Sequence, residues 1–290
     1  MDAWKTYRSL NPEQKQILAR KQLEVEKPVD ELLALLKGLA ACDSVANKSQ
    51  TRFGCTFGIL IVVTFASLIL FSNIGWGPLT FAALLLFVAG AVASGWFWMW
   101  LRGLDVSNNL RSFVLPVLAL FREDIDPKSP VRLRLDLTKP TLAPKKTAES
   151  DAYKHGVYHK VIDTTYVDPW MAAEAVLVDG TKLRWSVTDR IRERKKTKRN
   201  PRGKYKTKTK YRKVTDIDVQ LAMKTKTYAV GHAVGQVADV AVSDDGKRSK
   251  VDLQRSVRSA SLDPIDPRAL IDAITDVYRA ARPAKKEAHA

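Results

Sequence analysis

The chain has 290 residues, 46% of them hydrophobic, and carries a formal net charge of +17 at pH 7. Such an excess of positive charge indicates a polyanionic partner: an anionic lipid surface, a nucleic acid or an acidic protein. Only two cysteines are present, Cys42 and Cys55, and they form no CxxC motif, which excludes a disulfide framework.

The first 52 residues are nearly neutral, with nine basic residues against seven acidic ones. Residues 12–26 are predicted to form a helix that Pro28 ends, and an apolar stripe at helical spacing predicts another helix over 29–41. We therefore interpret residues 1–52 as an N-terminal helical region.

A block of 49 residues, 53–101, contains no Lys, Arg, Asp or Glu. Within it, residues 54–71 and 78–101 are each long and apolar enough to cross a hydrocarbon core of about 30 Å. Residues 72–77 predict a turn, so the block predicts a two-span transmembrane hairpin. A helix pair buried in a soluble core is the alternative. A secretory signal peptide is excluded because the first apolar run begins only at residue 53 and a second follows it.

Basic residues flank the block, and the turn inside it is uncharged. Lys48 and Arg52 precede the first span, and Arg102 and Arg111 follow the second. The positive-inside rule thus predicts a multi-pass protein of the cell (inner) membrane with cytoplasmic N- and C-termini. Neither span contains an ionisable Asp, Glu, Lys, Arg or His, so an ion path of charged side chains is not expected. Four aromatic residues next to Arg102 are typical of a membrane–water interface: Trp96, Phe97, Trp98 and Trp100.

Residues 102–130 are interpreted as a juxtamembrane region. Its apolar run, 112–121, is too short to cross a membrane. Two placements stay open: the run lies along the membrane interface, or it packs under the cytoplasmic domain.

Residues 131–265 predict a cytoplasmic, mainly antiparallel β domain. Residues 131–137 alternate apolar and polar side chains, Asp179-Gly180 predicts a hairpin turn, and so does the segment 244–246 between strands at 237–242 and 250–253. About seven or eight strands are expected, arranged as a sandwich or a small barrel.

Residues 266–290 predict a C-terminal helix and tail. Asp266 is the expected N-cap and Pro267 the first helical residue. The expected buried face comprises Leu270, Ala273, Ile274, Val277, Tyr278 and Ala281.

The densest charge lies between Lys182 and Lys213, where sixteen Lys or Arg residues accompany only two acids. Many of the cations occupy every second position, which is the side-chain period of a strand. The segment Asn200–Gly203 predicts a type I turn followed by a left-handed glycine. We therefore predict a two-stranded basic arm over residues 190–213. The turn would pair Val187 with Ile217 in an apolar column, whereas a one-residue slip would pair Val187 with Asp216.

In this register four like-charged pairs face one another, each destabilising by roughly 0.2–1 kcal/mol. Folding does not require this arrangement, so we interpret the face as a polyanion-binding site. A solvated face with no ligand is the alternative. The candidate binding residues are Arg190, Arg192, Arg194, Lys196, Lys198, Lys206, Lys208, Lys210 and Arg212.

Catalytic and metal-binding patterns are weak. His155 and His159 are four residues apart, but the residues between them favour a strand or loop, where that spacing separates the rings. We predict no metal site, no cofactor and no catalytic residue.

The expected function is a non-enzymatic membrane anchor or scaffold whose arm binds anionic lipid headgroups or an acidic protein, which includes further copies of this chain. One alternative is a membrane-embedded effector or sensor whose β domain encloses a small anionic, nucleotide-like ligand. A second is a membrane tether for nucleic acid. The cationic face offers few Asn or Gln side chains for reading bases, so that binding would be non-specific.

Overall fold

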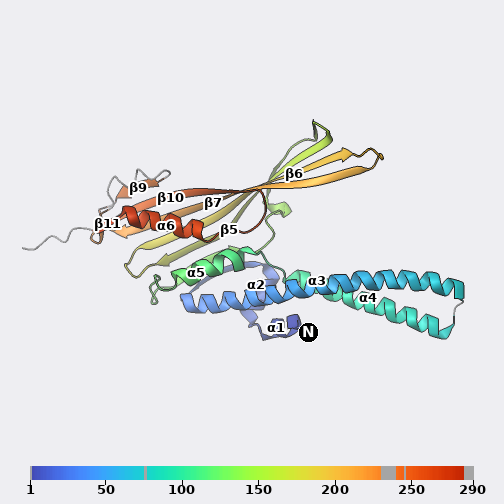
Figure 1. Ribbon diagram of the computed structural model, residues 1–290. Helices are drawn as coiled ribbons and strands as arrows, with labels where there is room; N and C mark the ends of the chain where they lie inside the picture. The colour runs from blue at the N-terminus through green and yellow to red at the C-terminus, as the bar shows by residue number, and fades with distance from the viewer. Residues whose placement is uncertain (1, 75–76, 230–239, 245, 284–290) are drawn as a thin grey trace, which may run out of the picture. The chain divides into compact units, whose positions relative to one another are not determined.

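A computed structural model describes residues 2–74, 77–229, 240–244 and 246–283 (Figure 1). The chain divides into two compact units. The helical unit comprises Met1–Arg20 and Lys37–Val106, and the sheet unit comprises Lys21–Leu36 and Ser107–Ala290.

Two long apolar helices form a hairpin in the helical unit (Figure 1). These are α3 (Val29–Ile74), which enters the unit at Lys37, and α4 (Pro78–Leu104). Both are long and apolar enough to cross a membrane. The helix pair of a soluble core buries its large apolar side chains, whereas many of these are exposed. Among them are Ile59, Val62, Phe65, Ile69, Leu79, Leu86 and Val92.

Small residues bring α3 and α4 together at one end of the hairpin. At Gly95, an added Cβ would lie 2.8 Å from the ring of Phe57. One residue earlier, the Ser94 hydroxyl lies 3.4 Å from the carbonyl oxygen of Phe53. Gly58 has no neighbour within 4 Å of such a Cβ, so it plays no part in this contact.

Two short helices, α1 (Asp2–Ser9) and α2 (Pro12–Arg20), precede α3. The helix expected over residues 12–26 is too long, because α2 ends at Arg20 and Lys21 takes a positive φ of 55°. Residues Gln22–Lys27 form strand β1 instead. The alternation of Leu23 with polar neighbours suits an edge strand that buries one face.

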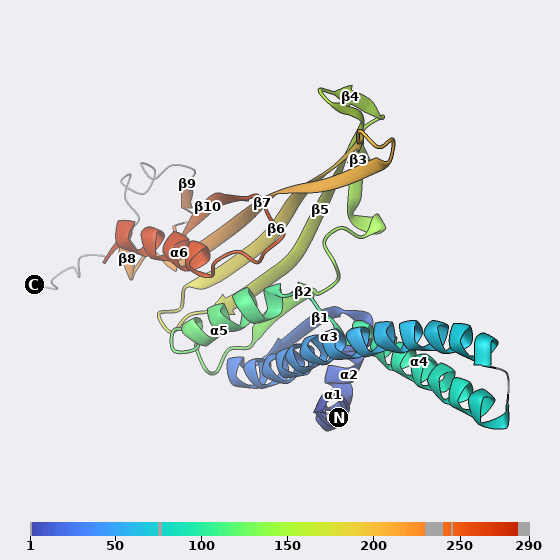
Figure 2. The same ribbon diagram turned by 45° about the vertical axis from the view of Figure 1, so that its right-hand side comes forward.

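The sheet unit contains a nine-stranded antiparallel sheet in the order β1-β2-β5-β6-β7-β10-β9, with β3 and β4 pairing β5 separately (Figures 1 and 2). The sheet is open, and the expected sandwich or barrel is not confirmed. Its remaining strands are β2 (Val131–Asp136), β3 (Lys146–Glu149), β4 (Tyr153–His155), β5 (Tyr158–Val176), β6 (Lys182–Arg199), β7 (Tyr205–Lys224), β9 (Val240–Asp244) and β10 (Arg248–Ser259). A separate pair joins β8 (Tyr228–Ala229) to β11 (Arg282–Pro283). Residues 237–239 of the strand expected at 237–242 lie outside the described residues.

Helices cover one face of the sheet (Figure 2). A π-helical turn, η1 (Leu110–Val114), leads into α5 (Leu115–Phe121). The ring of Phe113 packs edge-on against Trp170, and Phe121 packs against Trp185. The apolar run at 112–121 therefore packs under the β domain, which was one of the two placements left open by the sequence.

Helix α6 (Arg268–Ala280) covers the other part of the same face. The helix begins at Arg268 with Pro267 as its N-cap, one residue later than expected, and Asp266 accepts a hydrogen bond from the backbone N–H of Arg268. The expected apolar face is largely buried, with Leu270 and Val277 almost inaccessible, although the Tyr278 hydroxyl instead lies near Asp179. Among the described residues of the sheet unit, no helix covers the opposite face, where polar side chains such as Arg134, Arg184 and Ser186 lie.

Candidate polyanion-binding surface

Strands β6 and β7 extend beyond the helices and form the basic arm in the predicted register. Val187 pairs with Ile217, and Arg192 pairs with Arg212. The turn at Asn200–Gly203 explains the register. Gly203 has a φ of +80° and donates its N–H to the Asn200 carbonyl, while the Asn200 side chain accepts from Lys204.

The sequence predicted a two-stranded arm, but the arm has a third strand. The outer half of β5 pairs with β6 as far as Lys160 and Thr197 (Figures 1 and 2). This third strand places Asp163 directly opposite Arg194. The cationic face therefore includes a carboxylate that lies outside residues 190–213.

Carboxylates neutralise three of the nine candidate cations, all of them on β6. Arg190 lies 2.6 Å from Asp216, and Arg192 and Arg194 each lie 2.6 Å from Asp163. Hydrogen bonds from Arg194 and Arg192 hold the pKa of the Asp163 carboxyl well below its usual range. These three arginines are part of the folded charge network, so they are weaker candidates for binding a ligand.

The other six candidates have no acidic partner among the described residues. Two like-charged pairs lie directly opposite one another among them, Lys196 with Lys208 and Lys198 with Lys206, whereas Lys210 and Arg212 lie opposite Arg194 and Arg192. The exposed side chains of the six are mostly on β7. Lys196 lies over the ring of Tyr158 at 5.2 Å, a cation–π contact that leaves its charge uncompensated. We call these six the distal cationic surface: Lys196, Lys198, Lys206, Lys208, Lys210 and Arg212.

The reverse face of the arm is polar but neutralised. Glu193 accepts hydrogen bonds from the hydroxyls of Tyr166 and Tyr211, at 3.1 and 3.2 Å. Thr197 and Thr207 hydrogen-bond each other at 2.9 Å. Near the turn, Arg199 on this face donates a hydrogen bond to the carbonyl of Gly203. Most of the uncompensated charge of the arm thus lies on the opposite, cationic face.

A buried charged layer lies at the arm's base, on the helix-covered side of the sheet. Asp168 pairs across β5 and β6 with Asp189, and Lys145 and Lys213 approach these carboxylates at 2.7 and 3.7 Å. Burial raises the pKa of Asp168 to about 6, although Lys145 opposes the shift. The sequence analysis did not identify Lys145, Asp163 or Asp168, and only their strand pairing and the loop before β3 bring them to the arm.

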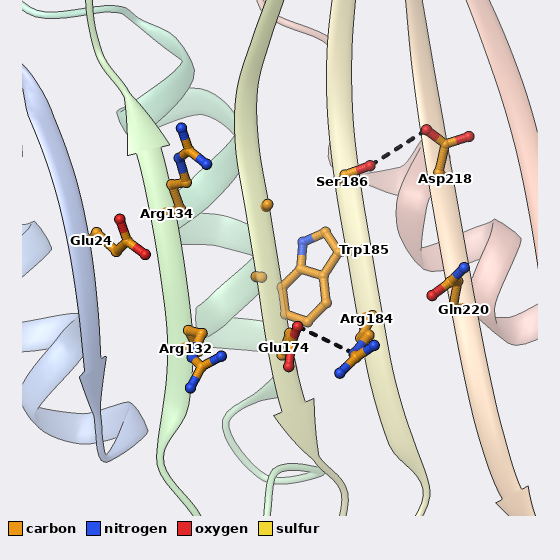
Figure 3. A pocket seen from close by; sticks show the side chains of 11 residues that line it. Glu24, Arg132, Arg134, Glu174, Arg184, Trp185, Ser186, Asp218 and Gln220 are labelled. Carbon is orange, nitrogen blue, oxygen red and sulfur yellow. Dashed lines mark hydrogen bonds and ion pairs between the residues drawn. The ribbon is translucent and has the colours of Figure 1, made fainter.

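A groove of about 330 Å³ lies on the helix-free face of the sheet (Figure 3). Its floor includes the small residue Ala172, and its charged lining residues are in part paired, with Arg184 lying 3.2 Å from Glu174. Arg134 has no ion-pair partner among the described residues. Arginines and acids are equally represented in the lining: Arg132, Arg134, Arg184, Glu24, Glu174 and Asp218.

The two histidines considered as metal ligands lie on different strands. His155 ends β4, and the His159 ring on β5 packs 5.0 Å from Tyr205 at the arm. Among the residues that the structure describes, no three His, Cys, Asp or Glu side chains are grouped as metal ligands.

Comparison with known proteins adds no function. No protein-family profile matches the chain, and neither a curated protein nor a solved structure is significantly similar to it. The functional argument therefore depends on the geometry of the chain itself.

Proposed function

We propose that the chain is a non-enzymatic anchor or scaffold of the cell (inner) membrane, and that its distal cationic surface binds a polyanion on the cytoplasmic side. One observation carries this proposal. Carboxylates compensate Arg190, Arg192 and Arg194 on β6, whereas the other six candidate cations have none among the described residues. Like charges held opposite one another destabilise the arm, and a bound polyanion removes that cost.

The hairpin of α3 and α4 supports the membrane part of the proposal. Its exposed apolar side chains favour a lipid environment, since water around them is unfavourable by about 25 cal/mol per Å² of apolar surface. Cations flank the apolar block at Arg52 and Arg102 but are absent inside it. The positive-inside rule then puts both ends of the chain in the cytoplasm.

Two partners suit the surface: an acidic protein segment and anionic lipid headgroups. Lysine is a compact, mobile point charge and binds carboxylates and phosphates alike. The carboxylate partner is supported by Arg194, which binds the Asp163 carboxylate on this face of the folded chain. The test below therefore includes a carboxylate probe and a lipid probe.

The experiment uses the full chain in nanodiscs of neutral phosphatidylcholine. A distal variant changes all six residues of the distal cationic surface to Gln. A charge-matched control changes six exposed cations elsewhere: Lys128, Lys139, Lys226, Lys250, Arg255 and Arg258.

Binding of fluorescent poly-L-glutamate and of phosphatidylserine vesicles is measured from 50 to 300 mM NaCl. The wild type and the control should bind one or both probes with an affinity that falls steeply with salt, and the distal variant should bind at least ten times more weakly. Equal binding by the distal variant and the control would refute the proposal.

The groove on the helix-free face favours a second candidate, the sensor of a small anionic ligand. Arg134 lines the groove without an ion-pair partner among the described residues. The groove lies on an exposed face, whereas the sequence predicted an enclosed cavity for a sensor. A sensor should bind a nucleotide equally well in the wild type and the distal variant, and lose it in Arg134→Gln.

The nucleic-acid tether is tested in the same nanodiscs with a random-sequence duplex of 30 base pairs. Salt-sensitive retention of the duplex by the wild type, absent from the distal variant, would favour that function. No retention at 50 mM NaCl would exclude it.

A further inference from the structure

We propose that the N-terminal helix α1 is an interfacial helix, which binds the headgroup layer of the bilayer beside the cytoplasmic end of α4. The proposal rests on the membrane crossing proposed above, but not on any ligand of the arm. All the residues involved belong to the helical unit.

Aromatic rings join α1 to α4. The ring of Trp4 lies edge-on to Trp100 with centroids 5.4 Å apart, and Tyr7 meets the same indole at 5.5 Å. Trp100 in turn lies 5.2 Å from Phe97, which contacts Phe53 on α3 at 4.6 Å. The rings of α1 thus continue the aromatic cluster at the end of the hairpin.

The position of Trp100 along α4 sets the depth of α1. Helix α4 has 27 residues and, at 1.5 Å per residue, is about 40 Å long. This exceeds a hydrocarbon core of about 30 Å, so the turns at its charged end project into the headgroup layer. Trp100 lies two residues before Arg102, in those turns. Trp4 contacts Trp100 and therefore lies at the same depth.

Cations lie over these rings. The Arg8 guanidinium is 5.0 Å from the centroid of Trp4, and the Lys15 ammonium is 5.7 Å from that of Tyr7. Arg102 similarly lies 4.7 Å from Trp98. Indole rings with an apolar body and a polar N–H, accompanied by Lys or Arg, are characteristic of the membrane–water interface.

The exposed side of α1 suits headgroups better than water. Trp4 remains 44% exposed despite its ring contacts, while Ala3 in α1 and Leu10 just after it are buried. A helix of eight residues is too short to be stable in isolation, so α1 depends on what it packs against. Phosphate groups next to Arg8 and Lys5, with lipid around the Trp4 ring, would complete its surroundings.

The test measures the depth of a nitroxide label in the full chain, in nanodiscs of phosphatidylcholine and phosphatidylglycerol. The background is Cys55→Ser, because Cys55 is exposed whereas Cys42 is fully buried and unavailable to the reagent. Labels are placed at Lys5→Cys on α1, at Leu85→Cys in the second span, and at Lys226→Cys, an exposed site in the sheet unit. Power saturation compares collisions with oxygen and with a water-soluble nickel complex.

The label at position 5 should lie at headgroup depth, with a nickel accessibility between those of the labels at positions 85 and 226. Replacing Trp4 and Tyr7 together by Ala should raise its nickel accessibility several-fold, toward that of position 226. Nickel accessibility at position 5 equal to that at 226 in the wild-type helix would overturn the inference. In that case, nickel accessibility at position 85 as well would show that the membrane crossing itself is wrong. Protection of position 85 from nickel would show that only the role given to α1 is wrong.

Discussion

Arg194 on β6 donates two hydrogen bonds to Asp163 on β5, from Nε at 2.6 Å and from Nη2 at 3.0 Å. Arg192 donates a third to the same carboxylate at 2.6 Å. Asp163 therefore acts as an internal ligand on the face proposed to bind a polyanion. Along β6 it marks the boundary between the compensated arginines and Lys196 and Lys198 of the distal cationic surface.

Changing Asp163 to Asn should strengthen polyanion binding, because it releases two arginines and adds one net positive charge to the face. We expect affinity for poly-L-glutamate to rise several-fold at 100 mM NaCl. Stability should fall by about 1 kcal/mol, since Asp163 and Arg194 are mostly buried but Arg192 is largely solvated. Asp252→Asn is the control: it makes the same charge change on an exposed part of β10 and should leave the affinity nearly unchanged. Equal affinities of the two variants would contradict the role given to Asp163.

Deprotonation of Asp168 should lower the free energy of unfolding as pH rises from about 4 to about 6.5. Its pKa is raised to about 6 in the folded chain, so the protonated form is favoured there. The stabilisation is complete below the unfolded pKa near 4 and is lost as pH rises through 6, by up to about 3 kcal/mol. The lowered pKa of Asp163 acts in a different window, below about pH 4.

Thermal unfolding of the wild type and Asp168→Asn, recorded between pH 4.5 and 7 in nanodiscs, tests this assignment. The difference in melting temperature between the two proteins should change across the interval, with the wild type losing relative stability as pH rises. A constant difference would show that Asp168 does not titrate there.

Gly95 should be intolerant of a large side chain, because a Cβ there would lie 2.8 Å from Phe57, whose ring is stacked on Trp98. We expect Gly95→Leu to separate α3 from α4 and to destabilise the hairpin by about 1–3 kcal/mol. Gly58→Leu is the matched control, since a Cβ at Gly58 meets nothing within 4 Å. Thermal denaturation in detergent, followed by tryptophan fluorescence, should distinguish the two.

Phe113 should be essential to the β domain rather than to membrane association. Its ring is fully buried and packs on Trp170, so Phe113→Ala should cost about 3–5 kcal/mol. Leu120 on the same segment is 59% exposed, and Leu120→Ala should change stability by less than about 0.5 kcal/mol. Comparable losses in both variants, measured by urea unfolding, would contradict the packing of this segment under the sheet.

The arm was predictable because its determinants are local. The turn residues Asn200 to Gly203 specify the hairpin, and the apolar pairs at its base select one register. The charge-free block likewise identified both long helices from composition alone.

The third strand of the arm could not be predicted in the same way. Asp163 lies 31 residues before Arg194, in a polar stretch without the alternation of a half-buried strand. Its placement depends on pairing with β6. Similarly, β1 is six residues long and its partner β2 lies far along the chain, so the short alternation around Leu23 was too weak by itself to separate it from the end of a helix.

Whether the sheet closes was also not decided by the sequence. Alternation in strands such as β2 indicates one buried face, and a barrel, a sandwich and an open sheet covered by helices all provide one. The observed cover comes from Phe113 and its neighbours, a segment whose apolar character suited a membrane interface equally well.

The most direct test of the proposed function is a quantitative pull-down from native membranes. The intact chain, the distal variant and the charge-matched control are solubilised under identical mild conditions at 100 mM NaCl, and co-purified proteins and lipids are quantified by mass spectrometry. The account predicts an acidic protein or an anionic lipid that is enriched with the intact chain and the control, and depleted at least tenfold with the distal variant. If the same partners are recovered in the same amounts with all three, the distal cationic surface does not bind the partner, and the central claim is wrong.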